Sequence, residues 1–264
     1  MNHHIGVTIS LDASEEVRQK AMMAANILHL PWKERKATLG ETCASDCDCL
    51  LIYTKQLPEI WTKDSIYRFH LGTAELRIKQ MKRGVQDRLL ALLPPRKDIV
   101  IVDATFGAGR DATVFSWYVG NAGKVISLEK SAALWAIGKE GLAQFSDSDK
   151  DVIEALRRIE LYHYDFVSWL LKAQSKSVDV IYFDTMFKHP VKRNANHIEA
   201  FRKSACYDTI QESILLEACR VARECIIVKE RSFSPLFKNE LFTKIDSKRG
   251  QSTAYGVITC KNRK

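Results

Sequence analysis

The sequence predicts an α/β protein built on a doubly wound, mostly parallel sheet, with a smaller α/β region before it. The first observation is the β-branched run Ile99–Val102, which is typical of a parallel strand buried on both faces. The second is the pair Gly107 and Gly109 just after it, where backbone can approach a ligand closely. The third is the helical pattern that follows, with Asp111 placed to cap it. Strand, glycine turn and helix together are the first unit of a nucleotide-binding sheet.

Composition agrees with a soluble globular chain of one large domain and a small appendage. The 264 residues are 46% hydrophobic and 27% charged, with a formal net charge of +8. This basic balance favours a polyanionic partner such as a nucleic acid. No apolar run reaches the length of a membrane span, and the first four residues have no signal-peptide character. The expected compartment is the cytoplasm, and the sequence is silent on oligomeric state.

The N-terminal residues 1–72 are expected to form the small α/β subdomain, and residues 73–264 the main domain. Alternating or apolar runs predict strands at 5–10, 50–54 and 66–70. Ser14 marks the start of a helix that Pro31 stops. Residues 33–49 are interpreted as a polar loop.

That loop holds three clustered cysteines, Cys43, Cys47 and Cys49. Their C-x3-C-x-C spacing differs from the paired C-x2-C of common zinc sites, and no second ligand pair follows. Reduced surface thiols of a cytosolic protein are the favoured interpretation. No metal site is predicted.

The main domain is expected to open with one long helix over residues 73–93. Leu76, Met81, Val85, Leu89 and Leu92 recur at helical spacing and predict an apolar stripe. The other face is basic and carries Arg77, Lys79, Lys82, Arg83 and Arg88. Such a face can follow a phosphate backbone, with Arg77, Lys82 and Arg83 as candidate RNA contacts. An ordinary solvated helix face is the alternative.

Strands and helices then alternate to the end of the chain. Besides 99–102, apolar runs predict strands at 124–128, 159–162, 178–183, 225–229, 242–246 and 253–259. Between them lie expected helices at 112–118, 132–145, 152–158, 166–173 and 207–222. The last two strands flank a polar turn and predict an antiparallel closure of a seven-stranded sheet.

Carboxylates follow the first three of these strands and suggest a ligand. Asp103 would repel a pyrophosphate but could accept hydrogen bonds from a cationic amino-acid group, which S-adenosylmethionine (SAM) carries. Glu129 is placed to accept both ribose hydroxyls, and Asp165 is a candidate adenine contact or a helix cap. Alanine at 112 is a permitted variant of the third dinucleotide glycine, so a nicotinamide dehydrogenase stays open. The alternative to a ligand site is an ordinary strand-turn-helix junction whose carboxylates cap helices.

The apolar strand 178–183 ends in Asp184, Thr185, Met186 and Phe187. In doubly wound folds the chemistry lies at the carboxyl ends of the strands, where the strand order reverses. Asp184 can accept hydrogen bonds from an exocyclic amine, and Phe187 can stack on the base that bears it. Lys188, Lys192 and Arg193 would surround this site with positive charge. A strand-end cap and a packed core phenylalanine are the alternatives.

These motifs resemble, in order, those of class I SAM-dependent methyltransferases, which have a Rossmann-like seven-stranded sheet. Residues 102–111, 127–130, 181–189 and 227–231 look like the bacterial J-type enzymes that methylate a guanine N2 of small-subunit ribosomal RNA. The resemblance implies SAM as cofactor and Asp184 and Phe187 at the target base. The cofactor contacts that it implies, with Lys130 beside them, are Asp103, Thr105, Gly107, Gly109, Arg110, Asp111 and Glu129.

Two positions depart from that family's pattern. Its proline after the aspartate is Thr185 here, and its proline after the phenylalanine is Lys188. Proline would stiffen the loop by restricting φ.

The main hypothesis, taken from the motifs together, is a methyltransferase acting on an exocyclic amine, guanine N2, of ribosomal RNA. The alternatives are a methyltransferase of a small molecule or protein, and an RNA-binding protein of this fold that has lost turnover.

Overall fold

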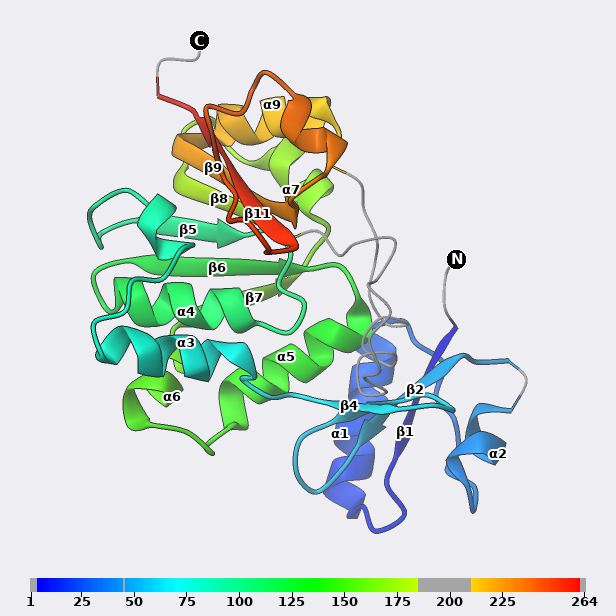
Figure 1. The fold of residues 1–264 in the computed structure, drawn as a ribbon. Coiled ribbons are helices and arrows are strands. Elements are labelled where there is room, and N and C mark those ends of the chain that lie inside the picture. Colours follow the sequence, from blue (N-terminus) through cyan, green and yellow to red (C-terminus); the bar gives the residue numbers. More distant parts are fainter. Residues whose placement is uncertain (1–3, 45, 185–209, 262–264) are drawn as a thin grey trace. The chain divides into compact units, whose positions relative to one another are not determined.

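The computed structural model describes residues 4–44, 46–184 and 210–261, and they form two compact units (Figure 1). The first unit contains the N-terminal residues up to His70 together with Ser131–Ser146, and the second begins at Leu71. The division at residues 72 and 73 stays a prediction. Thr185, Phe187, Lys188, Lys192 and Arg193 lie outside the described residues, so their predicted roles stay predictions. Among the described helices, none is both long and apolar enough to cross a membrane.

The first unit is a four-stranded sheet in the order β1-β2-β3-β4, with helices beside it. The sequence missed strand β3, which pairs with β2 through Leu51 and Ile60. It also missed helix α2 inside the predicted polar loop, where Thr38 and Glu41 form a reciprocal capping box. The elements are β1 (Ile5–Ile9), α1 (Glu15–Ile27), α2 (Leu39–Cys43), β2 (Cys49–Tyr53), β3 (Glu59–Trp61), β4 (Ile66–Arg68) and α5 (Ala132–Gln144).

The predicted reduced surface thiols are wrong. Cys43 and Cys47 are joined by a disulfide bond, and Cys43 is buried at the end of α2. Cys49 takes no part in this disulfide and is fully buried at the start of β2. The packing of α2 against β2 accounts for the burial of Cys43, which packs with Leu50 and Ile52, and Cys47 lies partly buried against the same cluster. The described residues contain no cluster of His, Cys, Asp and Glu able to hold a metal ion.

The second unit confirms the predicted seven-stranded sheet, in the order β10-β11-β9-β8-β5-β6-β7. Strands β5 to β9 are mutually parallel, and β11 runs antiparallel to both β9 and β10. The order reverses at β5, which has β6 on one side and β8 on the other. The strands are β5 (Val100–Asp103), β6 (Lys124–Glu129), β7 (Ile159–His163), β8 (Val178–Asp184), β9 (Ala222–Arg231), β10 (Lys244–Asp246) and β11 (Thr253–Thr259).

Helices cover both faces of this sheet (Figure 1). Successive side chains of β8 point to opposite faces and contact different helices. Phe183 packs edge-on against Phe166 of α7, in the core that α7 and α9 complete. Tyr182 points the opposite way and packs edge-on against Phe115 of α4. Asp184, two residues on, therefore lies on the α4 face. The helices are α3 (Thr73–Lys82), α4 (Arg110–Val119), α6 (Lys150–Arg157), α7 (Phe166–Lys172) and α9 (Glu212–Val221), with 3-10 turns η1 (Leu90–Leu92) and η2 (Pro235–Lys238).

The predicted long helix over 73–93 is wrong. Helix α3 ends at Lys82, and Gly84 has a φ of 84°, a left-handed conformation that breaks the helix. The predicted apolar stripe fails with it, because Leu76 and Val85 are exposed while Ala74, Ile78 and Leu89 are buried. Lys82 is paired with Asp149 and Asp151 rather than presented as part of a continuous basic face.

Candidate active site

The turn between β5 and α4 forms the floor of the candidate site. Gly107 and Gly109 both have positive φ, 55° and 70°. The Phe106 N–H donates to the Leu128 carbonyl at 2.9 Å, and the Gly107 N–H donates to a Glu129 carboxylate oxygen at 2.8 Å. The turn is therefore attached to the end of β6, with glycine where the chain bends left-handed.

Gly109→Ala is expected to lower the free energy of unfolding by about 2 kcal/mol or more. A left-handed conformation costs an L-residue about 1–2 kcal/mol, and a Cβ at this position would lie 2.5 Å from the Phe106 ring. Gly84→Ala is the matched control: its φ is also positive, but nothing lies within 4 Å of the added Cβ. Urea unfolding of both variants measures the difference. Equal losses would show that the Phe106 contact imposes no cost.

Carboxylates end three adjacent strands, as predicted. Asp103 ends β5 and accepts a hydrogen bond from the Thr105 N–H at 3.1 Å. Glu129 ends β6. Asp165 follows β7, where it caps α7 by accepting from the Ser168 N–H at 3.1 Å, and Lys130 Nζ lies 3.4 Å from its other oxygen. The capping interpretation of Asp165 is confirmed. This row of acceptors fits a ligand with an amino-acid group, a ribose and an adenine, as SAM has.

Asp103 is the most deeply buried acid of the row, 1% exposed. Burial, and then the charge of Asp111, raise the pKa of the Asp103 carboxyl well above its usual value. A cationic group placed beside Asp103 would relieve both penalties. A positive charge beside Asp103 would therefore be favourable, and SAM carries positive charges on its ammonium and sulfonium groups.

Asp184 is held at the end of β8 from two directions. Its backbone N–H donates to Thr105 Oγ1 at 2.7 Å, so the glycine turn of β5 and the end of β8 are directly joined. Lys229 of β9, its neighbour in register, donates from Nζ to Asp184 Oδ2 at 2.6 Å. Asp184 therefore lies where the strand order reverses, with its carboxylate oriented by a lysine.

Asp111 does not cap α4. Gly109 takes the N-cap position without a side-chain cap, and Asp111 lies buried in the first turn. Tyr182 donates to Asp111 Oδ2 at 2.7 Å, Lys229 donates to the same oxygen at 3.0 Å, and Arg77 pairs with Oδ1. Its carboxylate is turned inward because these three donors converge on it.

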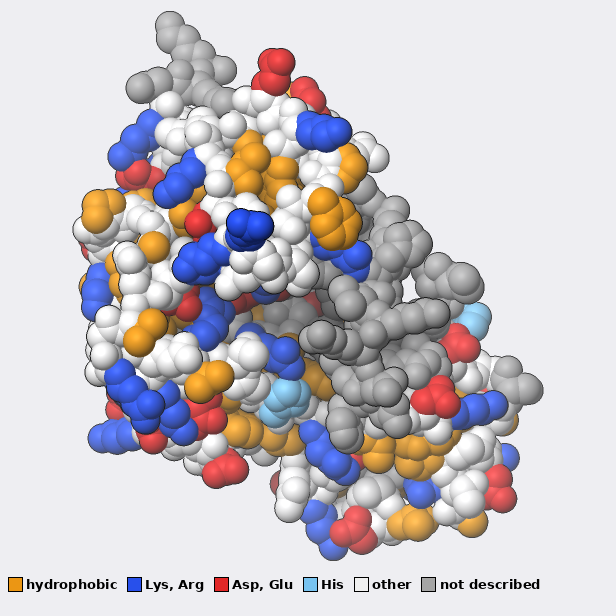
Figure 2. Space-filling view, in the orientation of Figure 1, with side chains coloured by type: hydrophobic (Ala, Val, Ile, Leu, Met, Phe, Trp, Pro, Cys, Tyr) orange, Lys and Arg blue, Asp and Glu red, His pale blue; other side chains and the backbone are white. Residues whose placement is uncertain are grey.

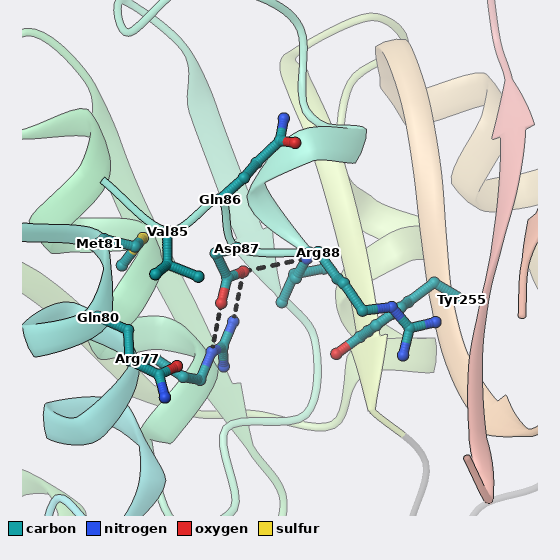
Figure 3. A pocket seen from close by; sticks show the side chains of 9 residues that line it. Arg77, Gln80, Met81, Val85, Gln86, Asp87, Arg88 and Tyr255 are labelled. Carbon is teal, nitrogen blue, oxygen red and sulfur yellow. Dashed lines mark hydrogen bonds and ion pairs between the residues drawn. The ribbon is translucent and has the colours of Figure 1, made fainter. Parts of the chain in front are cut away.

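Arg77 belongs to the same network, which corrects its interpretation as an RNA-facing residue. Its guanidinium forms two bonds with Asp87, at 2.7 and 2.9 Å (Figure 3). It also pairs with Asp111. The side chain is 19% exposed. A chain of alternating charges thus runs from Asp87 through Arg77, Asp111 and Lys229 to Asp184.

The pKa shifts in this network follow from the sharing of one lysine by two carboxylates. Burial would lower the pKa of Lys229, but Asp111 and Asp184 together raise it. Burial would raise the pKa of Asp111, but Lys229 and Arg77 hold it well below its usual range. Burial raises the pKa of Asp184, and Lys229 offsets this in part. Asp184 is therefore the more basic of the two carboxylates.

Sequence reasoning assigned no role to Lys229 or Tyr182. The signal for Lys229 was present, because it ends an apolar strand, the same position that singled out Asp184. Tyr182 gave no such signal, since a tyrosine within an apolar strand is an ordinary core residue. Arg110 is the first residue of α4, and the Lys130 carbonyl lies 3.1 Å from His163 Nε2.

Comparison with known proteins adds a family. A family model described as "Putative SAM-dependent methyltransferase" matches residues 55–255. The uncharacterized protein YpiP of Bacillus subtilis is 30% identical over 96% of this chain and 98% of its own length.

Curated ribosomal RNA small subunit methyltransferases J also match. The one from Laribacter hongkongensis is 32% identical over 53% of this chain and 49% of its own length. The one from Pseudoalteromonas atlantica is 24% identical over 89% and 91%. A solved SAM-dependent methyltransferase from Neisseria gonorrhoeae superposes with a TM-score of 0.66 at 15% identity, covering 98% and 97% of the two chains. That structural likeness shows a common fold.

Proposed function

Since the chain belongs to the family of SAM-dependent methyltransferases, we propose that it methylates an exocyclic amine, guanine N2, in small-subunit ribosomal RNA. Relatives named for that RNA support the proposal. So does the net charge of +8, because RNA is a polyanion. The same proposal places the enzyme in the cytoplasm with its substrate. The family leaves no support for the nicotinamide dehydrogenase.

The observation that carries the proposal is the carboxylate of Asp184 at the reversal of strand order. SAM supplies an electrophilic methyl group on a sulfonium, already a good leaving group. The amine nitrogen gains the bond to the methyl carbon as the sulfur–carbon bond breaks. Asp184 orients the amine beforehand and receives its proton, a task that its raised pKa favours. Lys229 orients that carboxylate, and Thr105 accepts from the backbone N–H of Asp184.

We assign Asp103 to the amino-acid end of SAM, and the assignment predicts a pH dependence. A cation beside Asp103 lowers the raised pKa of its carboxyl group. At pH values below the pKa that Asp103 has in the free protein, SAM binding is therefore expected to release a proton. Affinity should then rise with pH up to that pKa and level off above it. Calorimetry in two buffers of different ionisation enthalpy measures the released proton.

Asp103→Asn is expected to abolish this proton release and to weaken SAM on the order of tenfold, as loss of a charge-assisted bond does. Asp98→Asn, an exposed aspartate before the same strand, is the control and should retain both. Proton release that persists in Asp103→Asn would assign the titration to another group.

The proposed substrate is tested by mass spectrometry of ribosomal RNA from a strain that lacks the gene. One methyl group on a small-subunit guanine should be missing, and the purified enzyme with tritiated SAM should restore it. Intact methylation of ribosomal RNA, together with transfer of tritium to a protein or small-molecule fraction, would favour the first alternative. SAM binding with no transfer to any fraction would favour the degenerate RNA-binding protein.

A further inference from the structure

An exposed phenylalanine stands on the turn that follows β9. Phe233 is 72% exposed. Its turn is anchored on both sides: the Ser232 N–H donates to the Ser252 carbonyl at 3.0 Å, and the Ser234 N–H donates to the Arg231 carbonyl at 2.9 Å. Ser234 also caps the 3-10 turn η2. The ring is therefore held in solvent by an ordered backbone, at little further entropy cost for a ligand that uses it.

Arg231 lies against this ring, with its guanidinium carbon 5.7 Å from the ring centroid. It is two residues beyond Lys229 on β9, so both side chains lie on the face of the sheet that carries Asp184. A strand rises about 3.3 Å per residue, which places Arg231 about 7 Å beyond Lys229 toward the carboxyl edge. Arg231 at the end of β9, and Phe233 just beyond it, thus follow Lys229, the residue that pairs with Asp184 of the neighbouring strand β8.

The surroundings of the turn are basic. Lys248 and Arg249 are exposed in the turn that precedes β11, close in sequence to Ser252. Arg88, which is paired with Asp246 at 2.7 Å, lies over the Tyr255 ring at 5.3 Å and lines a hollow of about 250 Å³ (Figure 3). Over the C-terminal strands, Figure 2 shows Lys and Arg side chains interspersed with hydrophobic ones. Cations for phosphates and an aromatic for a base are the combination that binds single-stranded nucleic acid.

We propose that Phe233 and Arg231 form a stacking platform for an unpaired RNA nucleotide next to the target base. The inference rests on the proposed RNA substrate. An exocyclic amine engaged in a base pair is out of reach of an active site, so the substrate must be presented unpaired or be unstacked. A neighbouring base stacked on the exposed Phe233 ring would keep the RNA strand unpaired at the target base.

Binding of a fluorescein-labelled, mixed-sequence 16-nucleotide RNA, followed by fluorescence anisotropy, tests the platform. Phe233→Ala is expected to weaken the single strand on the order of tenfold, with little effect on a fully paired hairpin. Phe233→Trp should restore affinity, and its added fluorescence should be quenched on binding. Leu171→Ala, at a residue 67% exposed on α7, is the matched control and should change neither RNA. SAM affinity should be unchanged throughout.

The proposal is overturned if Phe233→Ala binds the single strand as wild type does, or no more weakly than Leu171→Ala. It is also overturned if Phe233→Ala loses the same affinity for the hairpin as for the single strand, or if the wild-type protein binds neither RNA. Binding does not require turnover, so a platform confirmed here together with intact ribosomal RNA methylation in the deletion strain would refute the proposed substrate alone.

Discussion

Asp184→Asn is expected to reduce the rate of methyl transfer at saturating SAM and substrate by about 10²–10³-fold. The loss follows from removing a preorganised negative charge at the point where positive charge develops on the amine. Thr105 Oγ1 bonds the backbone N–H of residue 184 rather than its side chain, so the end of β8 should stay in place. Single-turnover transfer of tritium from SAM measures the rate.

SAM affinity separates this role from a structural one. Asp184→Asn should bind SAM within about threefold of wild type, since Asp103 and Glu129 supply the contacts that we assign to the cofactor. Asp98→Asn should match wild type in both rate and affinity. An Asp184→Asn enzyme that transfers methyl groups at the wild-type rate would remove Asp184 from the mechanism.

Lys229→Met is expected to destabilise the fold by about 3–5 kcal/mol, because it leaves the buried Asp111 and the partly buried Asp184 without their shared cation. Asp111 is 8% exposed, and Lys229 itself is 24% exposed. For a chain of this size the midpoint of thermal unfolding should fall by about 10 °C. The depressed pKa of Asp111 adds a pH signature: its contribution to stability is present above the ordinary aspartate pKa and is lost as the pH falls below it. In Lys229→Met this acid dependence should shrink.

The double variant Lys229→Met/Asp111→Asn tests the cause. Removing the second charge should recover part of the lost stability, because Asp111, although still paired with Arg77, then no longer repels the Asp184 carboxylate. Lys150→Met is the control: its side chain is 92% exposed and pairs with Glu154, so less than about 1 kcal/mol is expected. If the loss of unfolding free energy in the double variant equals the sum of the losses in the two single variants, Lys229 and Asp111 are not coupled.

Local pattern was sufficient for most of the second unit. Continuous apolar runs predict buried strands, and each predicted strand of the seven-stranded sheet is present within a few residues. The rule that chemistry lies at the carboxyl ends of strands also singled out Asp103, Glu129 and Asp184 from their positions alone. The helix over 73–93 failed for a local reason as well, because Gly84 adopts a left-handed conformation that an apolar period does not reveal.

The amino-acid sequence by itself determined the order of strands and helices and the carboxylates at the strand ends, because burial and turn formation are written in spacing and residue type. The tertiary structure alone decided what those carboxylates contact. Lys229, Arg77 and Tyr182 reach Asp111 from elements far apart in the chain. A pattern of local spacing cannot show which distant charges are buried together. Burial and these neighbouring charges together shift the pKa of Asp184, and the ion pairs of Arg77 turn its side chain inward.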